Sequence, residues 1–289
     1  MIKDFRYLRP QDLQEALGML TEHAGEAKVI CGGQSLLILM RQGLVAPEYL
    51  IDIKHLEELS YIRPNEDGLR IGATTTHRAL EKSKELAERY PIIPEMEETL
   101  ASIQTRNWGT IGGNLSHADP AGDPAPVLIA LGAKVKLAKA DGTREMALED
   151  FFLDYFETAL EEDELLVEIS VPPVPARTGV AFEKFTIIGC DMGIVSATVR
   201  VTLDEGGRAA EARVVLGGAA PTPLRAKGAE EVLVGEDLRE ELLEEAGRKA
   251  SEECEPISDI HASEGYRREL VRVLTKRMLR KAWQRAAQG

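Results

Sequence analysis

The feature that most constrains the fold of this chain is the segment 106–133, RNWGTIGGNLSHADPAGDPAPVLIALGA. It combines repeated glycines with three prolines, two asparagines and two aspartates, and it then turns apolar. Glycine has no side chain, so it lets the main chain approach another group closely. An ordinary turn needs only a few such residues. The segment therefore predicts a backbone that is shaped to contact another group.

A second glycine pair, Gly32-Gly33, lies between an apolar strand at 29–31 and a helical run. Neither this pair nor Gly112-Gly113 follows GxGxxG or GxxxxGK[ST], so the two common nucleotide fingerprints are absent. A glycine turn that enters a helix still points several backbone N–H groups at one position, where the helix dipole favours an anion. Two such clusters favour a pyrophosphate site over two ordinary tight turns. Side-chain donors beside them are Gln34, Ser35, Thr110 and Asn114.

Periodicity and turn residues predict an α+β chain. The first segment reads as a parallel βαβ unit, with a helix between the strand at 29–31 and a strand in EYLIDI. Thr75 or Thr76 is expected to cap a helix over 77–90. Asp123 followed by Pro124 predicts a helix start with Asp123 as the N-cap. A hairpin is expected around Asp141-Gly142.

The proline-rich segment 171–180 is the best candidate for a linker. Beyond it the pattern predicts strands of an antiparallel sheet and then three helical runs. The expected division is a first domain over 1–172, with subdomains of about 1–56 and 57–172, and a second domain over 177–289.

Composition excludes several classes of protein. A net charge of −14 argues against a nucleic-acid partner, because phosphate backbones need a basic surface. The three scattered cysteines form no CxxC pair, which argues against a metal or iron–sulfur site here. No apolar run approaches the length of a membrane span. The N-terminal residues lack the apolar stretch of a signal peptide, so the cytoplasm is the expected location.

Five segments together carry a resemblance to a known family. CGGQSLL and the segment 106–133 resemble the first and second flavin motifs of the FAD-binding subunits of molybdenum hydroxylases. EKFTIIGCDMGIVSA, LGGAAPTPLRAKGAEEVLVG and YRRELVRVLTKRMLRKA are similar to successive parts of its C-terminal flavoprotein domain. The likeness runs in the family's order from about Phe5 to the end of the chain.

The resemblance implies a vanillyl-alcohol-oxidase-type fold, in which two α+β subdomains hold FAD ahead of a C-terminal α+β domain. It also implies electron transfer: an iron–sulfur subunit receives electrons from a molybdopterin subunit, and FAD passes them to an external acceptor. Molybdopterin and iron–sulfur clusters are expected only in those partner subunits.

Position by position, the resemblance assigns FAD contacts to both motifs and to one residue beyond them. Lys184 is expected near the isoalloxazine, as the candidate catalytic residue. Gln34 stands where relatives with covalent flavin have histidine, so non-covalent FAD is expected. The family commonly has an arginine shortly after Lys184, where this chain has Ile187-Ile188-Gly189. The assigned residues are Cys31, Gly32, Gly33, Gln34, Ser35, Thr110, Gly112, Gly113, Asn114, His117, Asp123 and Lys184, and no metal ligand is assigned.

Two other functions remain open at this level: a free-standing FAD-dependent oxidoreductase with its own substrate site, and a non-catalytic nucleotide-binding module. His77, at a predicted helix start, is either a cofactor neighbour or a solvated histidine. The basic run near the C-terminus, 266–282, predicts an amphipathic helix that packs on its own domain. Docking to an acidic partner subunit is the alternative.

Overall fold

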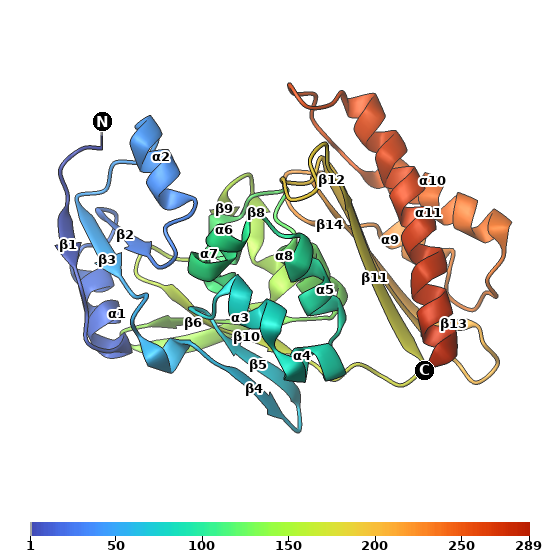
Figure 1. Ribbon diagram of the computed structural model, residues 1–289, viewed down its shortest axis with the longest axis horizontal. Helices are drawn as coiled ribbons and strands as arrows, with labels where there is room; N and C mark the ends of the chain where they lie inside the picture. Colours follow the sequence, from blue (N-terminus) through green and yellow to red (C-terminus); the bar gives the residue numbers. More distant parts are fainter. Residues whose placement is uncertain (1) are drawn as a thin grey trace.

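The computed structural model describes residues 2–289, and its three larger sheets follow one another along the molecule (Figure 1). The first is a small sheet of three parallel strands in the order β1-β3-β2. Helix α2 connects β2 to β3, so the predicted parallel βαβ unit is confirmed. The elements of this part are β1 (Arg6–Leu8), α1 (Leu13–Glu22), β2 (Ala27–Ile30), α2 (Leu36–Gln42), β3 (Tyr49–Asp52) and the 3-10 turn η1 (Glu57–Leu59).

The middle part is a five-stranded antiparallel sheet in the order β4-β5-β10-β6-β7, with short helices packed on it (Figure 1). Strands β6 and β7 form the hairpin predicted around Asp141-Gly142. The strands of this sheet are β4 (Ile62–Asn65), β5 (Gly68–Gly72), β6 (Lys134–Lys139), β7 (Gly142–Ala147) and β10 (Leu165–Val171). Strands β8 (Phe152–Asp154) and β9 (Glu157–Thr158) form a separate two-stranded sheet, and η2 spans Leu148–Asp150. The helices are α3 (His77–Lys82), α4 (Lys84–Arg89), α5 (Ile92–Thr99), α6 (Ile103–Trp108), α7 (Ile111–His117) and α8 (Pro124–Ala130).

The C-terminal part is the predicted antiparallel sheet, in the order β11-β12-β13-β14, with helices on one side. The long helix α11 lies along β11 and β12, and α10 packs beside it (Figure 1). The apolar core of the C-terminal part includes Leu270, Val271 and Met278 of α11. The elements are β11 (Thr178–Phe185), β12 (Val195–Leu203), β13 (Ala209–Gly217), β14 (Leu224–Arg225), α9 (Lys227–Glu231), α10 (Glu240–Glu253) and α11 (Glu264–Gln288). The predicted α+β fold class is confirmed.

Two local predictions differ from the structure. The helix expected over 77–90 is two helices, because Ser83 leaves the helical conformation and caps α4 by accepting from the Leu86 N–H. The glycine pair in TIGGN is not a turn ahead of a helix, since it lies in the first turn of α7 itself. Thr76 is the cap of α3, as one of the two expected alternatives. In residues 2–289, no helix has the length and apolar character needed to span a bilayer.

Candidate functional site

The first glycine pair touches the segment that leads into the second. A Cβ atom on Gly32 would lie 2.4 Å from the Trp108 carbonyl oxygen and 2.7 Å from the Gly109 Cα. Real side chains do not make contacts this short, so the two backbones pass each other only because residue 32 is glycine. The two motifs therefore lie next to each other, although they are far apart in the sequence.

The turn after β2 leaves polar groups available at this contact. Gly33 has a φ of +67°, a left-handed conformation that favours glycine. The exposed Gln34 donates from Nε2 to the Gly32 carbonyl at 3.1 Å. Ser35 precedes α2, but its side chain makes no capping hydrogen bond. Burial raises the pKa of the Cys31 thiol, while a hydrogen bond with Thr110 acts in the opposite direction.

The second glycine pair is held at the start of α7. The Thr110 hydroxyl caps this helix by accepting from the Gly113 N–H at 3.3 Å. A Cβ on Gly112 would lie 2.6 Å from the Ala73 Cβ, so this glycine lets α7 pack against the end of β5. Gly113 is exposed, and the one close neighbour of a Cβ there would be the Thr110 hydroxyl, at 2.9 Å. Gly113 therefore presents its backbone to solvent.

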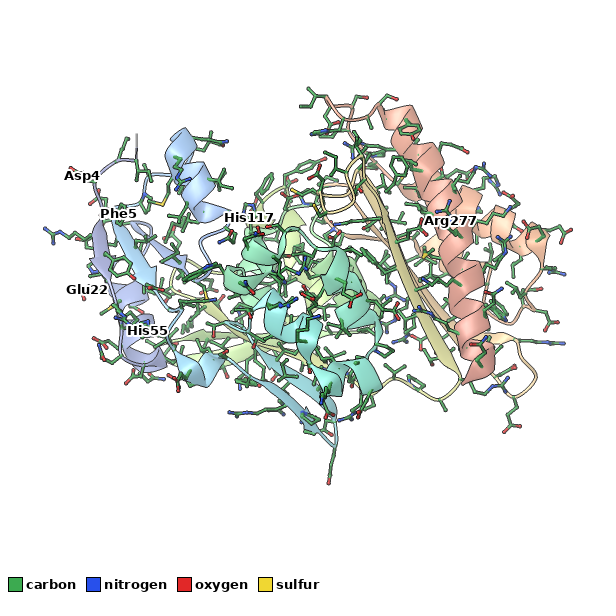
Figure 2. The ribbon with its side chains drawn as sticks, in the orientation of Figure 1. Asp4, Phe5, Glu22, His55, His117 and Arg277 are labelled. Carbon is green, nitrogen blue, oxygen red and sulfur yellow. The ribbon has the colours of Figure 1, made fainter. Side chains whose placement is uncertain are left out.

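Asn114 and His117 continue along α7. Asn114 is half-buried, and its Oδ1 would lie 3.4 Å from a Cβ on Gly122. His117 ends the helix, in the central part of the molecule (Figure 2), with its ring centroid 5.3 Å from that of Phe156. Burial lowers the pKa of His117, which favours the neutral imidazole at neutral pH.

Asp123 and Lys184 form a buried ion pair between the middle part and the C-terminal sheet. Lys184 Nζ lies 2.6 Å from Asp123 Oδ2, and the two side chains are 4% and 5% exposed. Asp123 begins α8, but its carboxylate does not cap the helix as predicted, because it faces Lys184. Burial raises the pKa of Asp123 to about 6, against the opposing effect of Lys184. Within residues 2–289, Asp123 Oδ1 is buried and has no hydrogen-bond partner.

A second buried pair, His77 and Glu97, lies next to the second motif. His77 Nδ1 is 3.0 Å from Glu97 Oε2, and both side chains are almost completely buried. The His77 backbone N–H donates to the Gly109 carbonyl at 3.1 Å, which ties α3 to the second motif. The sequence left His77 open and did not single out Glu97. The sequence signal that could have found it is helical spacing: Glu97 follows Ile93 by four residues, which places both on the buried face of α5.

The basic side chains of α11 are largely paired within the chain. Glu244 accepts from Arg272 and Lys276, and Glu240 accepts from Arg280. Arg277, labelled on α11 in Figure 2, pairs with Glu183 of β11. These contacts confirm that the helix packs on its own domain.

Comparisons with known proteins identify the family of this chain. Residues 3–174 match the model of the FAD binding domain in molybdopterin dehydrogenase, and residues 180–282 match the CO dehydrogenase flavoprotein C-terminal domain. The chain belongs to the family of molybdopterin dehydrogenase FAD-binding proteins. The predicted resemblance, the oxidoreductase class and FAD as the cofactor are confirmed. Among residues 2–289 there is no cluster of potential ligands that could hold a metal ion.

Individual relatives match over almost the whole chain. The alpha subunit of the 6-hydroxypseudooxynicotine dehydrogenase complex of Paenarthrobacter nicotinovorans is 35% identical, over 98% of this chain and 95% of its own. A solved carbon monoxide dehydrogenase of Hydrogenophaga pseudoflava is 35% identical with a TM-score of 0.96, covering 99% of both chains. The quinoline 2-oxidoreductase of Pseudomonas putida 86 is 34% identical with a TM-score of 0.94, again covering 99% of both chains.

Proposed function

We propose that this chain is the FAD-containing electron-transfer subunit of a molybdenum hydroxylase complex. A molybdopterin subunit would pass electrons to an iron–sulfur subunit, and this chain would receive them from the iron–sulfur subunit. Its FAD would then pass them to an external acceptor. The observation that carries the proposal is the contact between the two glycine motifs, the second of which also contains a buried carboxylate with one unsatisfied oxygen. The near-complete match to subunits named in dehydrogenase complexes supports it.

The residues present fit the dinucleotide. A buried acceptor without a partner is costly in a folded protein, and a ligand hydroxyl would satisfy Asp123 Oδ1. Gly113 is exposed at the start of α7 and has no side chain, so a phosphate oxygen could approach backbone N–H groups there. When bound, FAD supplies the redox chemistry that the protein side chains lack.

We assign the contacts by motif. The diphosphate would lie against Gly32, Gly33, Gln34 and Ser35, with Cys31 packed beneath them, and Thr110, Gly112, Gly113, Asn114 and His117 would hold the diphosphate and ribityl chain. Asp123 would accept from a ribityl hydroxyl. Lys184 would lie near the isoalloxazine, and its ion pair with Asp123 gives it the role of keeping that carboxylate charged and in place.

The flavin itself tests the assignment. The purified chain should be yellow, and acid precipitation should release FAD into the supernatant, because Gln34 has no imidazole with which to form a covalent link. Chromatography of the supernatant identifies the nucleotide. FMN in place of FAD, or flavin that remains in the pellet, would contradict the proposal.

Partnership needs a separate experiment. Alone, the chain should exchange electrons with an artificial dye, yet purines, aldehydes and carbon monoxide should leave its flavin oxidised. Co-expression with the neighbouring iron–sulfur and molybdopterin chains should restore substrate-driven reduction of the flavin for one substrate class. Reduction by the isolated chain would favour the alternative, a free-standing flavoenzyme.

A further inference from the structure

Lys54 lies at the junction of the two glycine motifs. Strands β2 and β3 are parallel, and Ile30 pairs with Asp52. The Ile53 N–H still donates to the Ile30 carbonyl, so continuing this register places Lys54 beside Gly32. Ligands of parallel sheets bind beyond the carboxyl ends of the strands, which is where both residues lie.

The ammonium of Lys54 makes one hydrogen bond and has donors left for a ligand. Its Nζ donates to the Trp108 carbonyl at 2.8 Å, and this is the oxygen that excludes a side chain from Gly32. An ammonium has three donors, so two remain for another group. The neighbouring His55, labelled in Figure 2, instead contacts the Pro10 carbonyl.

The neighbouring carboxylate, that of Asp52, already accepts hydrogen bonds from other groups. Asp52 Oδ1 accepts from the backbone N–H of Lys54 at 2.9 Å, and Oδ2 accepts from the Tyr7 hydroxyl. Within residues 2–289, no carboxylate forms an ion pair with the Lys54 ammonium. A half-buried lysine without an acidic partner is unexpected in a chain of net charge −14. Burial lowers the pKa of Lys54, and an anion beside it would oppose that shift.

We propose that Lys54 binds the diphosphate of the dinucleotide, with its ammonium anchored on the Trp108 carbonyl beside Gly32. The inference rests on the proposed function, because it takes the diphosphate to lie against the first motif. The acidic protein repels an anion at long range, so a local cation with free donors adds charge-assisted hydrogen bonds where they are most effective. Lys54 would also keep the two motifs together while they bind.

The inference is tested by titrating the apoprotein with FAD and measuring binding from the quenching of flavin fluorescence. Lys54→Met should weaken FAD binding about tenfold, the loss expected for one charge-assisted contact. Lys54→Arg should keep most of the affinity. The matched control is Lys28→Met, which removes the same charge from an exposed position on β2. ADP and adenosine are then tested as competitors that displace FAD. Lys54→Met should lower the affinity for ADP in the same proportion as the affinity for FAD, and it should leave the affinity for adenosine unchanged.

The outcomes separate the two proposals. A wild-type apoprotein that does not bind FAD contradicts the proposed function. Wild-type affinity in Lys54→Met, or an equal loss for ADP and adenosine, overturns the role of Lys54 and leaves the proposed function standing. Thermal unfolding checks that each variant is folded. If Lys54→Met unfolds, Lys54→Gln carries the same test, because its amide can still donate to Trp108 without a charge.

Discussion

Gly32-Gly33 and Gly112-Gly113 look alike in the sequence, yet the first pair forms a turn ahead of a helix and the second lies inside one. In the first pair, Gly32 is required by a backbone contact and Gly33 by its positive φ. In the second, Gly112 is required by packing against Ala73, whereas Gly113 is exposed and a Cβ there would meet only the Thr110 hydroxyl.

The comparison shows that glycine enrichment at a binding site has two separate origins. Three of these four positions are needed for the protein to fold as it does, and they bring the motifs together. Gly113 is the position where the fold makes the weakest demand, since a Cβ there would meet only the Thr110 hydroxyl, and its proposed role is to leave room for the ligand. Substitution at each position can separate folding from binding.

The largest effects are expected at the two packing glycines. Gly32→Ala and Gly112→Ala should each lower the free energy of unfolding by about 3 kcal/mol, since the added methyl group meets backbone or a fixed Cβ and forces the chain to move. Urea unfolding of the apoprotein measures this. A loss below about 1 kcal/mol at both positions would show that the contacts relax easily.

A smaller effect is expected at Gly33. Gly33→Ala should cost roughly 1–2 kcal/mol, because alanine disfavours the left-handed conformation. Gly43→Ala is the matched control: its φ is +75°, and a Cβ there has nothing within 4 Å. Both variants should lose stability by thermal unfolding, Gly33→Ala somewhat more because its Cβ would also lie 3.1 Å from Leu37 Cδ1, but only Gly33→Ala should weaken FAD binding. Equal FAD affinities in the two variants would remove Gly33 from the site.

The smallest change in stability is expected at Gly113. In Gly113→Ala, the gain in helix propensity and the displacement of the Thr110 cap are each worth about 1 kcal/mol and should nearly cancel. FAD affinity should nevertheless fall about tenfold or more, because the methyl group occupies the ligand's space. Gly18→Ala on the exposed side of α1 is the control, and it should bind FAD normally. Normal binding by Gly113→Ala would contradict the assignment.

Local signals in the sequence predicted much of the fold. The βαβ unit, the Thr76 cap, the hairpin at Asp141-Gly142 and the C-terminal sheet with its helices all follow from periodicity and turn residues close in the chain. The helix over TIGGN was missed because glycine disfavours helix, and the packing against Ala73 that overrides this preference is not visible locally.

The site was predicted less completely, because its electrostatics are non-local. Asp123 has the sequence context of an N-cap, and only the approach of Lys184 from the C-terminal sheet gives its carboxylate a different partner. The pairing of His77 with Glu97, and of Lys54 with the Trp108 carbonyl, likewise joins segments that no spacing rule connects.

Helix α11 covers the apolar face of β11 and β12, and it follows them in the chain by two further strands and two helices. On the ribosome, these strands emerge well before the helix that shields them, whereas almost all of the middle core is complete once β10 has appeared. The nascent chain therefore passes through an interval with a finished flavin-binding part and an uncovered sheet. Chaperone binding and aggregation during synthesis are expected to concentrate in that interval.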